Sequence, residues 1–200
     1  MAPSSTLLHP AEAAILAGID DTIIERVRQL RLMAFDVDGV LTDGLLWYGD
    51  QGETTKSFHV HDGHGLRLLK ESGLHVVLIT GRESTIVARR GAELGMQYIL
   101  QGIRDKGQAL VELCHELGIS TEQTGFMGDD LIDLSAMQRA GFAACVPGAP
   151  AYVAQAAHWV ATQAGGAGAV RECCDLILAA QGRLASFFSP QSVLMPGAIQ

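Results

Sequence analysis

Cysteine is scarce in this 200-residue chain, and no apolar run approaches the length of a membrane span. The four cysteines form no Cys-x-x-Cys pair, which argues against a disulfide framework or a cysteine-rich metal site. The first residues also lack a basic segment followed by an apolar one. These absences predict a cytoplasmic protein that has no membrane partner and whose cysteines are reduced core residues.

Positive charge and proline are scarce as well. The net charge of -8 argues against binding of nucleic acid backbones and favours a small-molecule partner. No proline lies between Pro10 and Pro147, and no linker-like stretch interrupts this region. We therefore expect one domain over residues 31–182, preceded by a helical extension at 1–30 and followed by an extended or weakly ordered tail at 183–200.

Apolar runs alternate with amphipathic stretches from Arg31 onward. This alternation is typical of an α/β fold, and we predict a Rossmann-like parallel sheet sandwiched by helices. Ligands bind at the carboxyl ends of the strands in such a sheet. The expected strands lie near residues 32–36, 75–80, 97–100, 124–127 and 142–146.

A β-hairpin insertion at residues 45–60, with a five-residue turn at 49–53, departs from this alternation. It carries large apolar side chains, and an exposed apolar edge is normally covered. We expect the hairpin to pack against another subunit, and the alternative is that its side chains fold back on their own sheet. The apolar residues are Leu45, Trp47, Tyr48 and Phe58.

Two carboxylates follow the first predicted strand in the segment Asp36-Val37-Asp38-Gly39. Because side chains alternate along a strand, Asp36 and Asp38 project to the same side, and Gly39 allows a sharp turn. Ionised carboxylates at the tip of a buried strand are expected to meet a cation, a proton or a substrate. One of them can attack while the other exchanges protons, although an ordinary acidic turn or a calcium loop has the same pattern.

Three later features, in a fixed order, favour catalysis. Thr80-Gly81-Arg82 ends the second strand, Lys106 opens a helix, and the acidic segment Gly128–Asp133 follows the strand at 124–127. Together with Asp36-Val37-Asp38-Gly39 they resemble the phosphatase signature of the haloacid dehalogenase superfamily. Since only the hairpin is inserted after the first motif, the resemblance implies a phosphatase without a cap domain.

Within that superfamily, residues from about Leu32 to Gly182 resemble the 3-deoxy-D-manno-octulosonate 8-phosphate phosphatases. The likeness includes the segment Phe58–Gly65 and the glycine-rich segment Gly165–Glu172. It implies Mg²⁺-dependent hydrolysis of an acidic sugar phosphate in lipopolysaccharide precursor synthesis. It also implies a homotetramer in which neighbouring hairpins close each other's pockets.

The resemblance assigns roles to the acidic residues. Asp36 is expected to attack phosphorus and form an aspartyl-phosphate, while Asp38 acts first as acid and then as base. The expected metal ligands are Asp36, the backbone carbonyl of Asp38, and Asp129. Asp130 and Asp133 are expected to orient these ligands and their waters.

Other residues are expected to bind the substrate. Thr80 and the Gly81 amide donate hydrogen bonds to the phosphoryl group, and Lys106 neutralises its charge, although helix capping and a plain surface charge are alternatives. Many family members carry Arg at the position of His61, where a neutral imidazole still offers a hydrogen bond. The full predicted substrate-binding set is Asp38, His59, Val60, His61, Asp62, Gly63, Arg67, Gly81, Arg82, Arg90 and Lys106.

Other interpretations remain open. His59, His61 and His64 suggest zinc, because two of them alternate on one predicted strand face, but the spacing suits a closed tetrahedral site poorly. The substrate alternative is a nine-carbon keto-deoxy acid sugar phosphate. A phospho-accepting receiver module is a third interpretation, although receivers place the acidic pair before the acceptor, whereas here Asp129 and Asp130 come last.

Overall fold

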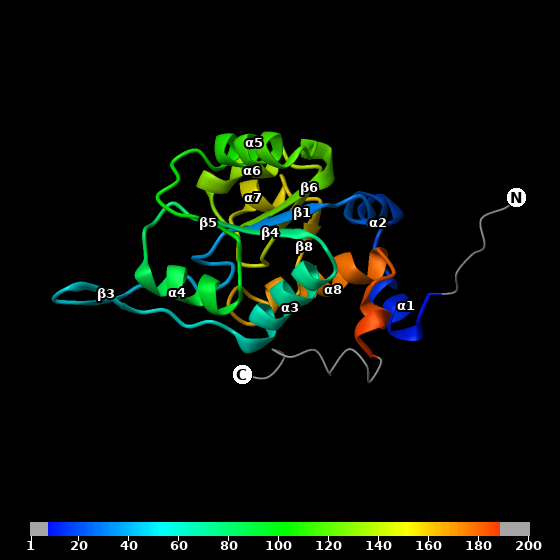
Figure 1. Ribbon diagram of the computed structural model, residues 1–200, viewed down its shortest axis with the longest axis horizontal. Coiled ribbons are helices and arrows are strands. Elements are labelled where there is room, and N and C mark those ends of the chain that lie inside the picture. The colour runs from blue at the N-terminus through cyan, green and yellow to red at the C-terminus, as the bar shows by residue number, and fades with distance from the viewer. Residues whose placement is uncertain (1–7, 189–200) are drawn as a thin grey trace, which may run out of the picture.

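A six-stranded parallel sheet forms the centre of the computed structural model, which describes residues 8–188 (Figure 1). The strand order is β5-β4-β1-β6-β7-β8, and each described pairing is parallel. This confirms the predicted Rossmann-like α/β fold, with an added short edge strand, β8. The strands are β1 (Leu32–Phe35), β4 (His75–Ile79), β5 (Tyr98–Leu100), β6 (Thr124–Gly128), β7 (Phe142–Cys145) and β8 (Trp159–Val160).

Helices cover both faces of the sheet, because alternate residues of the central strand face opposite cores. In β1, Met33 and Phe35 belong to one hydrophobic cluster and Leu32 and Ala34 to the other. Both faces are therefore apolar, as expected for a parallel sheet. The first face is covered by α3 (Val60–Glu71), α4 (Thr85–Glu93) and α8 (Ala169–Ala180), and the second by α5 (Lys106–Leu117), α6 (Leu134–Met137) and α7 (Ala151–Ala154) (Figure 1).

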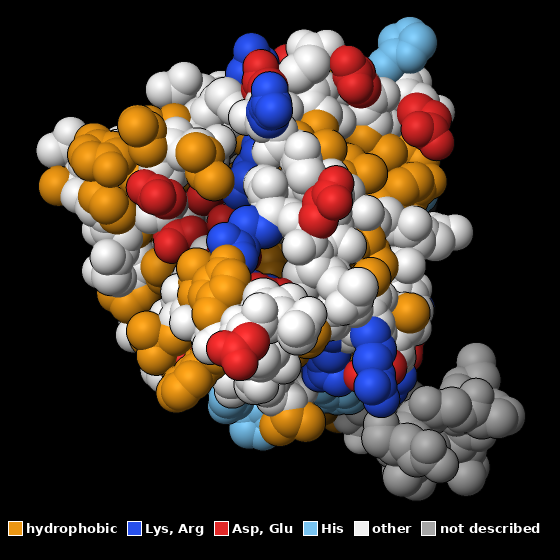
Figure 2. All heavy atoms as spheres, turned by 90° about the vertical axis from the view of Figure 1, so that its left-hand side faces the viewer, with side chains coloured by type: hydrophobic (Ala, Val, Ile, Leu, Met, Phe, Trp, Pro, Cys, Tyr) orange, Lys and Arg blue, Asp and Glu red, His pale blue; other side chains and the backbone are white. Residues whose placement is uncertain are grey.

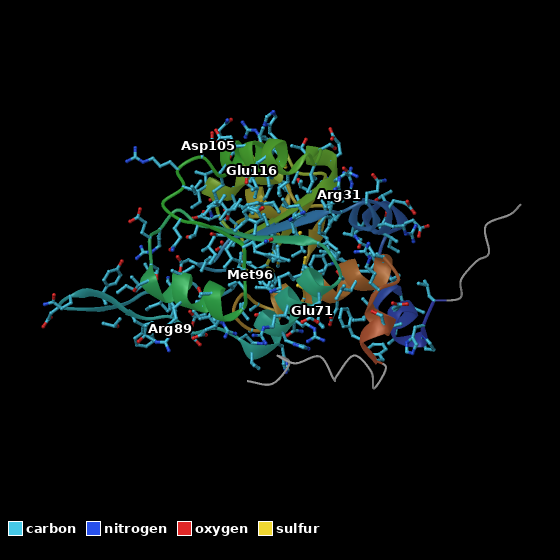
Figure 3. The ribbon with its side chains drawn as sticks, viewed as in Figure 1. Arg31, Glu71, Arg89, Met96, Asp105 and Glu116 are labelled. Carbon is cyan, nitrogen blue, oxygen red and sulfur yellow. The ribbon has the colours of Figure 1, made fainter. Side chains whose placement is uncertain are left out.

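Side chains follow this layering (Figure 3). Met96 is buried beside the sheet, whereas Glu71, Arg89 and Glu116 lie exposed on the outer sides of their helices. The short helices η1 (Thr121–Gln123) and η2 (Leu131–Asp133) flank β6 at its two ends. None of the helices within residues 8–188 is both long and apolar enough to cross a membrane.

The hairpin projects from one end of the molecule (Figure 1), and it is shorter than predicted. It consists of β2 (Trp47–Gly49) and β3 (Gly52–Thr55), with Gly49 paired to Gly52. The predicted five-residue turn is therefore wrong, because only two residues separate these strands. The expected second strand up to residue 60 also ends early, since β3 stops at Thr55 and helix α3 begins at Val60.

Two helices precede the sheet, α1 (Pro10–Leu16) and α2 (Asp21–Arg28). The short helix η3 (Leu184–Phe188) follows α8, and the backbone amide of Ala185 donates to the buried carboxylate of Glu12, 3.0 Å away. The prediction of an extended tail from residue 183 is thus wrong for η3, because Leu184 is buried in the core. Residues 189–200 lie outside the described part, and the domain division at residues 30 and 182 stays a prediction.

Candidate active site

The polar strand ends predicted from the sequence meet at one edge of the sheet. Strand β1 pairs with β4 on one side and with β6 on the other, in parallel register. Asp36 follows β1, Thr80 follows β4, and Asp129 follows β6. The residues at these three neighbouring carboxyl ends are therefore brought together by the strand order alone.

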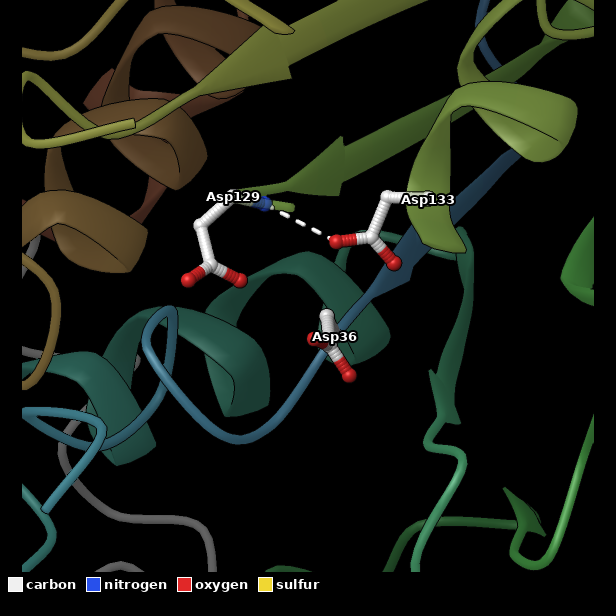
Figure 4. A group of neighbouring side chains, drawn as sticks. All are labelled: Asp36, Asp129 and Asp133. Atoms are coloured by element: carbon white, nitrogen blue, oxygen red, sulfur yellow. Dashed lines mark hydrogen bonds between the residues drawn. The ribbon is translucent and has the colours of Figure 1, made fainter. Parts of the chain in front are cut away.

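Three aspartates form the centre of this edge (Figure 4). Asp36, Asp129 and Asp133 each offer a carboxylate oxygen, and these oxygens lie within 4.8 Å of one another. Asp133 is fixed from behind, because its Oδ2 accepts hydrogen bonds from the backbone amides of Asp129, at 2.9 Å, and Asp130, at 3.1 Å. Gly39, with φ +92°, packs so closely that a Cβ atom there would lie 2.0 Å from Asp129 Oδ2.

Lys106 supplies the positive charge beneath the aspartates. Its ammonium nitrogen is fully buried and lies 2.7 Å from Asp36 Oδ1 and 2.6 Å from Asp133 Oδ1. Burial by itself lowers the pKa of this lysine, but the two carboxylates raise the pKa above its ordinary value. Lys106 is therefore cationic, and it is shared between a residue that follows β1 and one that follows β6.

One ammonium group does not balance three carboxylates. Burial, followed by repulsion from Asp133, raises the pKa of Asp36 to about 7, and burial with repulsion from Asp133 and Asp130 raises the pKa of Asp129 to about 6. Asp129 Oδ1 is also buried without a hydrogen-bond partner. This excess of negative charge and the unpaired carboxylate oxygen fit a small, hard divalent cation, which prefers oxygen ligands.

We expect the stability of the metal-free protein to reflect these raised pKa values. Between the ordinary pKa of 3.8 and about 6 to 7, the folded state holds protons on Asp36 and Asp129 that the unfolded chain has released. These two groups therefore destabilise the metal-free fold as the pH rises through that range. Since a cation competes with those protons, the rise in melting temperature on adding Mg²⁺ should be larger at pH 8 than at pH 5.5.

Thermal unfolding with EDTA or with excess Mg²⁺ measures this difference. Asp129→Asn should abolish most of the Mg²⁺-dependent rise, whereas Asp43→Asn, on the loop that follows Asp36 but exposed, should retain it. Equal rises at the two pH values would contradict the assignment of raised pKa values to the metal site.

Thr80 and Gly81 lie at the neighbouring strand end. Thr80 is buried, and its hydroxyl oxygen accepts a hydrogen bond from the backbone amide of Arg82 at 3.3 Å. That oxygen still has a proton to donate. The backbone of Thr80 is held by Leu100 and Ile103, which fixes this turn beside β1.

The comparisons with known proteins agree with this arrangement. Residues 96–171 match the model of a family described as haloacid dehalogenase-like hydrolases. The 3-deoxy-D-manno-octulosonate 8-phosphate phosphatase KdsC of Escherichia coli (strain K12) is 43% identical over 172 residues, which cover 86% of this chain and 92% of that protein. The chain belongs to the 3-deoxy-D-manno-octulosonate 8-phosphate phosphatase family. The resemblance predicted from its motifs is thereby confirmed.

Solved structures of family members share the fold. The phosphatase of Moraxella catarrhalis, crystallised with magnesium ion, phosphate ion and KDO, matches with a TM-score of 0.81 and 44% identity, over 84% of this chain and 96% of that one. The cobalt-bound form of the Haemophilus influenzae phosphatase matches with a TM-score of 0.81 and 40% identity, over 85% of this chain and 99% of that one.

Asp38 of this family member belongs to a second ion-pair network, which its sequence does not predict. Its carboxylate pairs with Lys56, and its Oδ2 lies 3.7 Å from Arg82 Nε. Lys56 also lies 2.9 Å from Glu53 Oε1. In the sequence, Glu53 and Lys56 look like an ordinary pair of surface charges three residues apart, and only the spacing of opposite charges hinted at their contact.

The predicted sugar-binding residues around the start of α3 do not reach the aspartates. Within residues 8–188, no hydrogen bond or ion pair joins them to Asp36, Asp129 or Lys106. The Asp62 carboxylate instead accepts from the backbone amides of Arg171, at 2.8 Å, and Gly168, at 3.3 Å, at the start of α8. The side chain of Asp62 therefore fastens α3 to α8, and its contact with a sugar stays a prediction.

The remaining members of this set lie on α3, at its start, or on the neighbouring helix α4. Arg90 lies over the Phe58 ring, 5.9 Å from its centroid, and packs on Gly63, while Arg67 donates to the Glu93 carbonyl at 2.9 Å. Val60 is exposed. His59 and His61 stand at the beginning of the helix with their rings 5.0 Å apart. The strand-face geometry behind the zinc interpretation is thus wrong, because residues 60 and 61 are helical.

The glycine-rich segment after β8 supports the loop that carries Asp36 and Asp38. A Cβ atom on Gly165 would lie 1.8 Å from the carbonyl oxygen of Gly39, and the Gly166 amide donates to Val40 at 3.0 Å. Only glycine permits this approach of two backbones. Arg171, in the same segment of the sequence, pairs with Asp175 at 2.8 Å within α8.

Proposed function

We propose that this protein is a magnesium-dependent phosphatase that hydrolyses 3-deoxy-D-manno-octulosonate 8-phosphate to the free sugar acid and inorganic phosphate. The observation that carries the proposal is the buried Lys106 bridging Asp36 and Asp133, with Asp129 beside them and Asp38 on the adjoining loop. Its relatives in Escherichia coli and Yersinia pestis bear the name of this activity, at 43% identity. It acts in the cytoplasm, in lipopolysaccharide precursor synthesis.

The reaction has two halves that use the same acids. The Asp36 carboxylate attacks phosphorus, the bond from phosphorus to the sugar oxygen breaks, and Asp38 gives that oxygen its proton. Water then attacks the phosphorus of the aspartyl-phosphate, and Asp38 takes a proton from the water. The bond between phosphorus and the Asp36 oxygen breaks, which regenerates the Asp36 carboxylate and frees inorganic phosphate. Lys106 keeps the Asp36 carboxylate in place and neutralises charge on the phosphoryl oxygens, while Thr80 and the Gly81 amide donate hydrogen bonds to them.

Asp36, Asp129 and the backbone carbonyl of Asp38 would hold Mg²⁺, with Asp130 and Asp133 orienting the ligands. A bound Mg²⁺ supplies the positive charge that allows a phosphate dianion to approach a carboxylate. The unpaired Asp129 Oδ1 and the clustered oxygens support this assignment. We expect EDTA to abolish turnover and Mg²⁺ to restore it.

Phosphate release from a panel of purified sugar phosphates tests the substrate. We expect kcat/KM for the eight-carbon ester to exceed that for a nine-carbon keto-deoxy ester by at least about tenfold, since discrimination by one or two pocket contacts has this size. A preference for the nine-carbon ester would overturn the choice of substrate. A phosphorylated form that lasts for minutes would instead support the receiver interpretation.

The protein is also proposed to be a homotetramer that assembles through the hairpin. In the single chain, Leu45, Leu46, Trp47 and Tyr48 are exposed, and hydrophobic side chains gather on the face that carries the hairpin (Figure 2). Acidic and basic side chains lie in the hollow between these apolar groups. Because His61, Arg67 and Arg90 do not reach their own aspartates, they suit a sugar held by a neighbouring subunit.

Sedimentation of the purified protein tests this assembly. We expect four subunits for the native chain and a smaller species for Trp47→Glu, which places a charge in the apolar patch. A native chain that sediments as a fully active monomer would contradict the proposal.

A further inference from the structure

Lys56 is a buried cation that none of the steps above uses. It follows β3, at the base of the hairpin, and its side chain is only 1% exposed although most of the hairpin is open to solvent. Lysine is rarely buried to this extent unless it is paired, since burying an ammonium group is costly. Both of its partners are carboxylates, and one of them belongs to Asp38.

The second partner, Glu53, fixes Lys56 from the other side. Glu53 Oε1 lies 2.9 Å from the ammonium nitrogen of Lys56 and 3.7 Å from Arg82 Nη2. The hydroxyl of Ser84, the residue that caps α4, donates to the other carboxylate oxygen of Glu53. The hairpin is thus joined to α4 through Glu53, and to the loop that carries Asp38 through Lys56.

This network determines where the Asp38 carboxylate points. Lys56 and Arg82 both contact it, and within residues 8–188 Asp38 forms no ion pair with Lys106, which serves Asp36 and Asp133. Each aspartate of the Asp36-Val37-Asp38 motif therefore has a buried lysine beside it, one from the start of α5 and one from the base of the hairpin. The two lysines keep the two carboxylates in separate positions.

We propose that Lys56, held by Glu53, is a positioning residue that aims the Asp38 carboxyl group at the leaving oxygen of the substrate. The inference rests on the proposed phosphatase reaction and adds a role for the hairpin in proton transfer. A rival role is purely structural: Lys56 fastens the hairpin and affects all substrates alike. The two roles differ in their dependence on the leaving group.

Two substrates separate them, because an alkyl leaving group needs a proton and p-nitrophenolate does not. General acid catalysis contributes about 10²- to 10⁴-fold to rate. For Lys56→Met we expect kcat/KM to fall about 100-fold with 3-deoxy-D-manno-octulosonate 8-phosphate and less than about threefold with p-nitrophenyl phosphate. The same selective loss is expected for Asp38→Asn, and the double variant should be hardly worse than either single one.

The matched control is Lys70→Met, on α3, where the lysine donates to the carbonyl oxygens of Leu94 and Gly95 and, within residues 8–188, forms no ion pair. Lys70→Met should leave kcat/KM unchanged for both substrates. Equal losses on both substrates for Lys56→Met, or additive losses in the double variant, would overturn the proposal. If Lys56→Met does not fold, Glu53→Gln provides the test, because it releases Lys56 without removing it and should show the same selectivity in weaker form.

Failure of the proposed substrate is distinguishable from failure of this inference. If the native enzyme hydrolyses p-nitrophenyl phosphate but not the eight-carbon ester, the substrate assignment is wrong. Glycerol phosphate then replaces the sugar ester as the alkyl substrate, and the ratio of kcat/KM values decides the role of Lys56 as before.

Discussion

Replacement of Asp36 by Asn should abolish phosphate release while leaving the protein folded. An amide cannot form the aspartyl-phosphate, and loss of a nucleophile in other hydrolases lowers kcat by about 10⁶-fold. We expect a loss of at least about 10⁴-fold, limited by the detection of residual hydrolysis. The measurement is phosphate release under saturating Mg²⁺, together with mass spectrometry of the rapidly quenched enzyme, which should show the added phosphoryl group only in the native chain.

The fold should tolerate this change because the amide keeps the shape of the carboxylate and Lys106 retains Asp133 as a partner, at 2.6 Å. Asn also removes a buried carboxylate whose pKa is raised to about 7. The metal-free variant should therefore melt no lower than the native chain at pH 8. Asp43→Asn, on the same loop but exposed, is the matched control and should keep full activity. Substantial turnover by Asp36→Asn would remove Asp36 from the mechanism.

The strand ends that form the site could be predicted because their signals are local. Apolar runs that stop at Asp36, Thr80 and Asp129 predict buried strands that end in polar residues. In a parallel sheet the carboxyl ends of all strands lie at the same edge. The order of the motifs along the chain also indicated the family. The adjacency of β4, β1 and β6 in the sheet depends on packing, and no short segment shows it.

The start of α3 was mispredicted because local signals there favour a strand. His59, Val60 and His61 alternate polar and apolar side chains, no side chain caps the helix at His59, and Gly63 and Gly65 weaken a helix. Packing against α8 overrides these preferences. The bonds from Arg171 and Gly168 to Asp62 join residues more than 100 positions apart, so no local pattern predicts them.

The role of Lys56 was hidden for the same reason. Charged residues in a hairpin are normally solvated, and the burial of this lysine follows only from the way the hairpin folds onto the loop of Asp38. The turn itself was equally undecided in the sequence, because residues 49–53 offer two glycines. The fold uses Gly52 at φ +105°, which shortens the turn to two residues.

Replacement of Lys106 by Met should have the second large effect, on both stability and activity. It leaves Asp36, Asp129 and Asp133 clustered without their shared cation, and removal of one partner from a buried ion pair costs about 3–5 kcal/mol. The metal-free variant should therefore be much less stable than the native chain at pH 8. The difference in stability should be smaller at pH 5.5, where Asp36 and Asp129 can take up protons.

Mg²⁺ should restore part of the lost stability of Lys106→Met but little of its activity. A cation bound only by the folded state stabilises it by mass action and can replace the missing charge on the carboxylates. It cannot replace the ammonium group that orients Asp36 and binds the phosphoryl oxygens, and loss of one such group lowers kcat by about 10²- to 10³-fold. Thermal unfolding and kcat, each measured with and without Mg²⁺, separate the two effects. Lys70→Met should match the native chain in both, whereas recovery of full activity by Lys106→Met in Mg²⁺ would mean that Lys106 serves only to balance the charge of the aspartates.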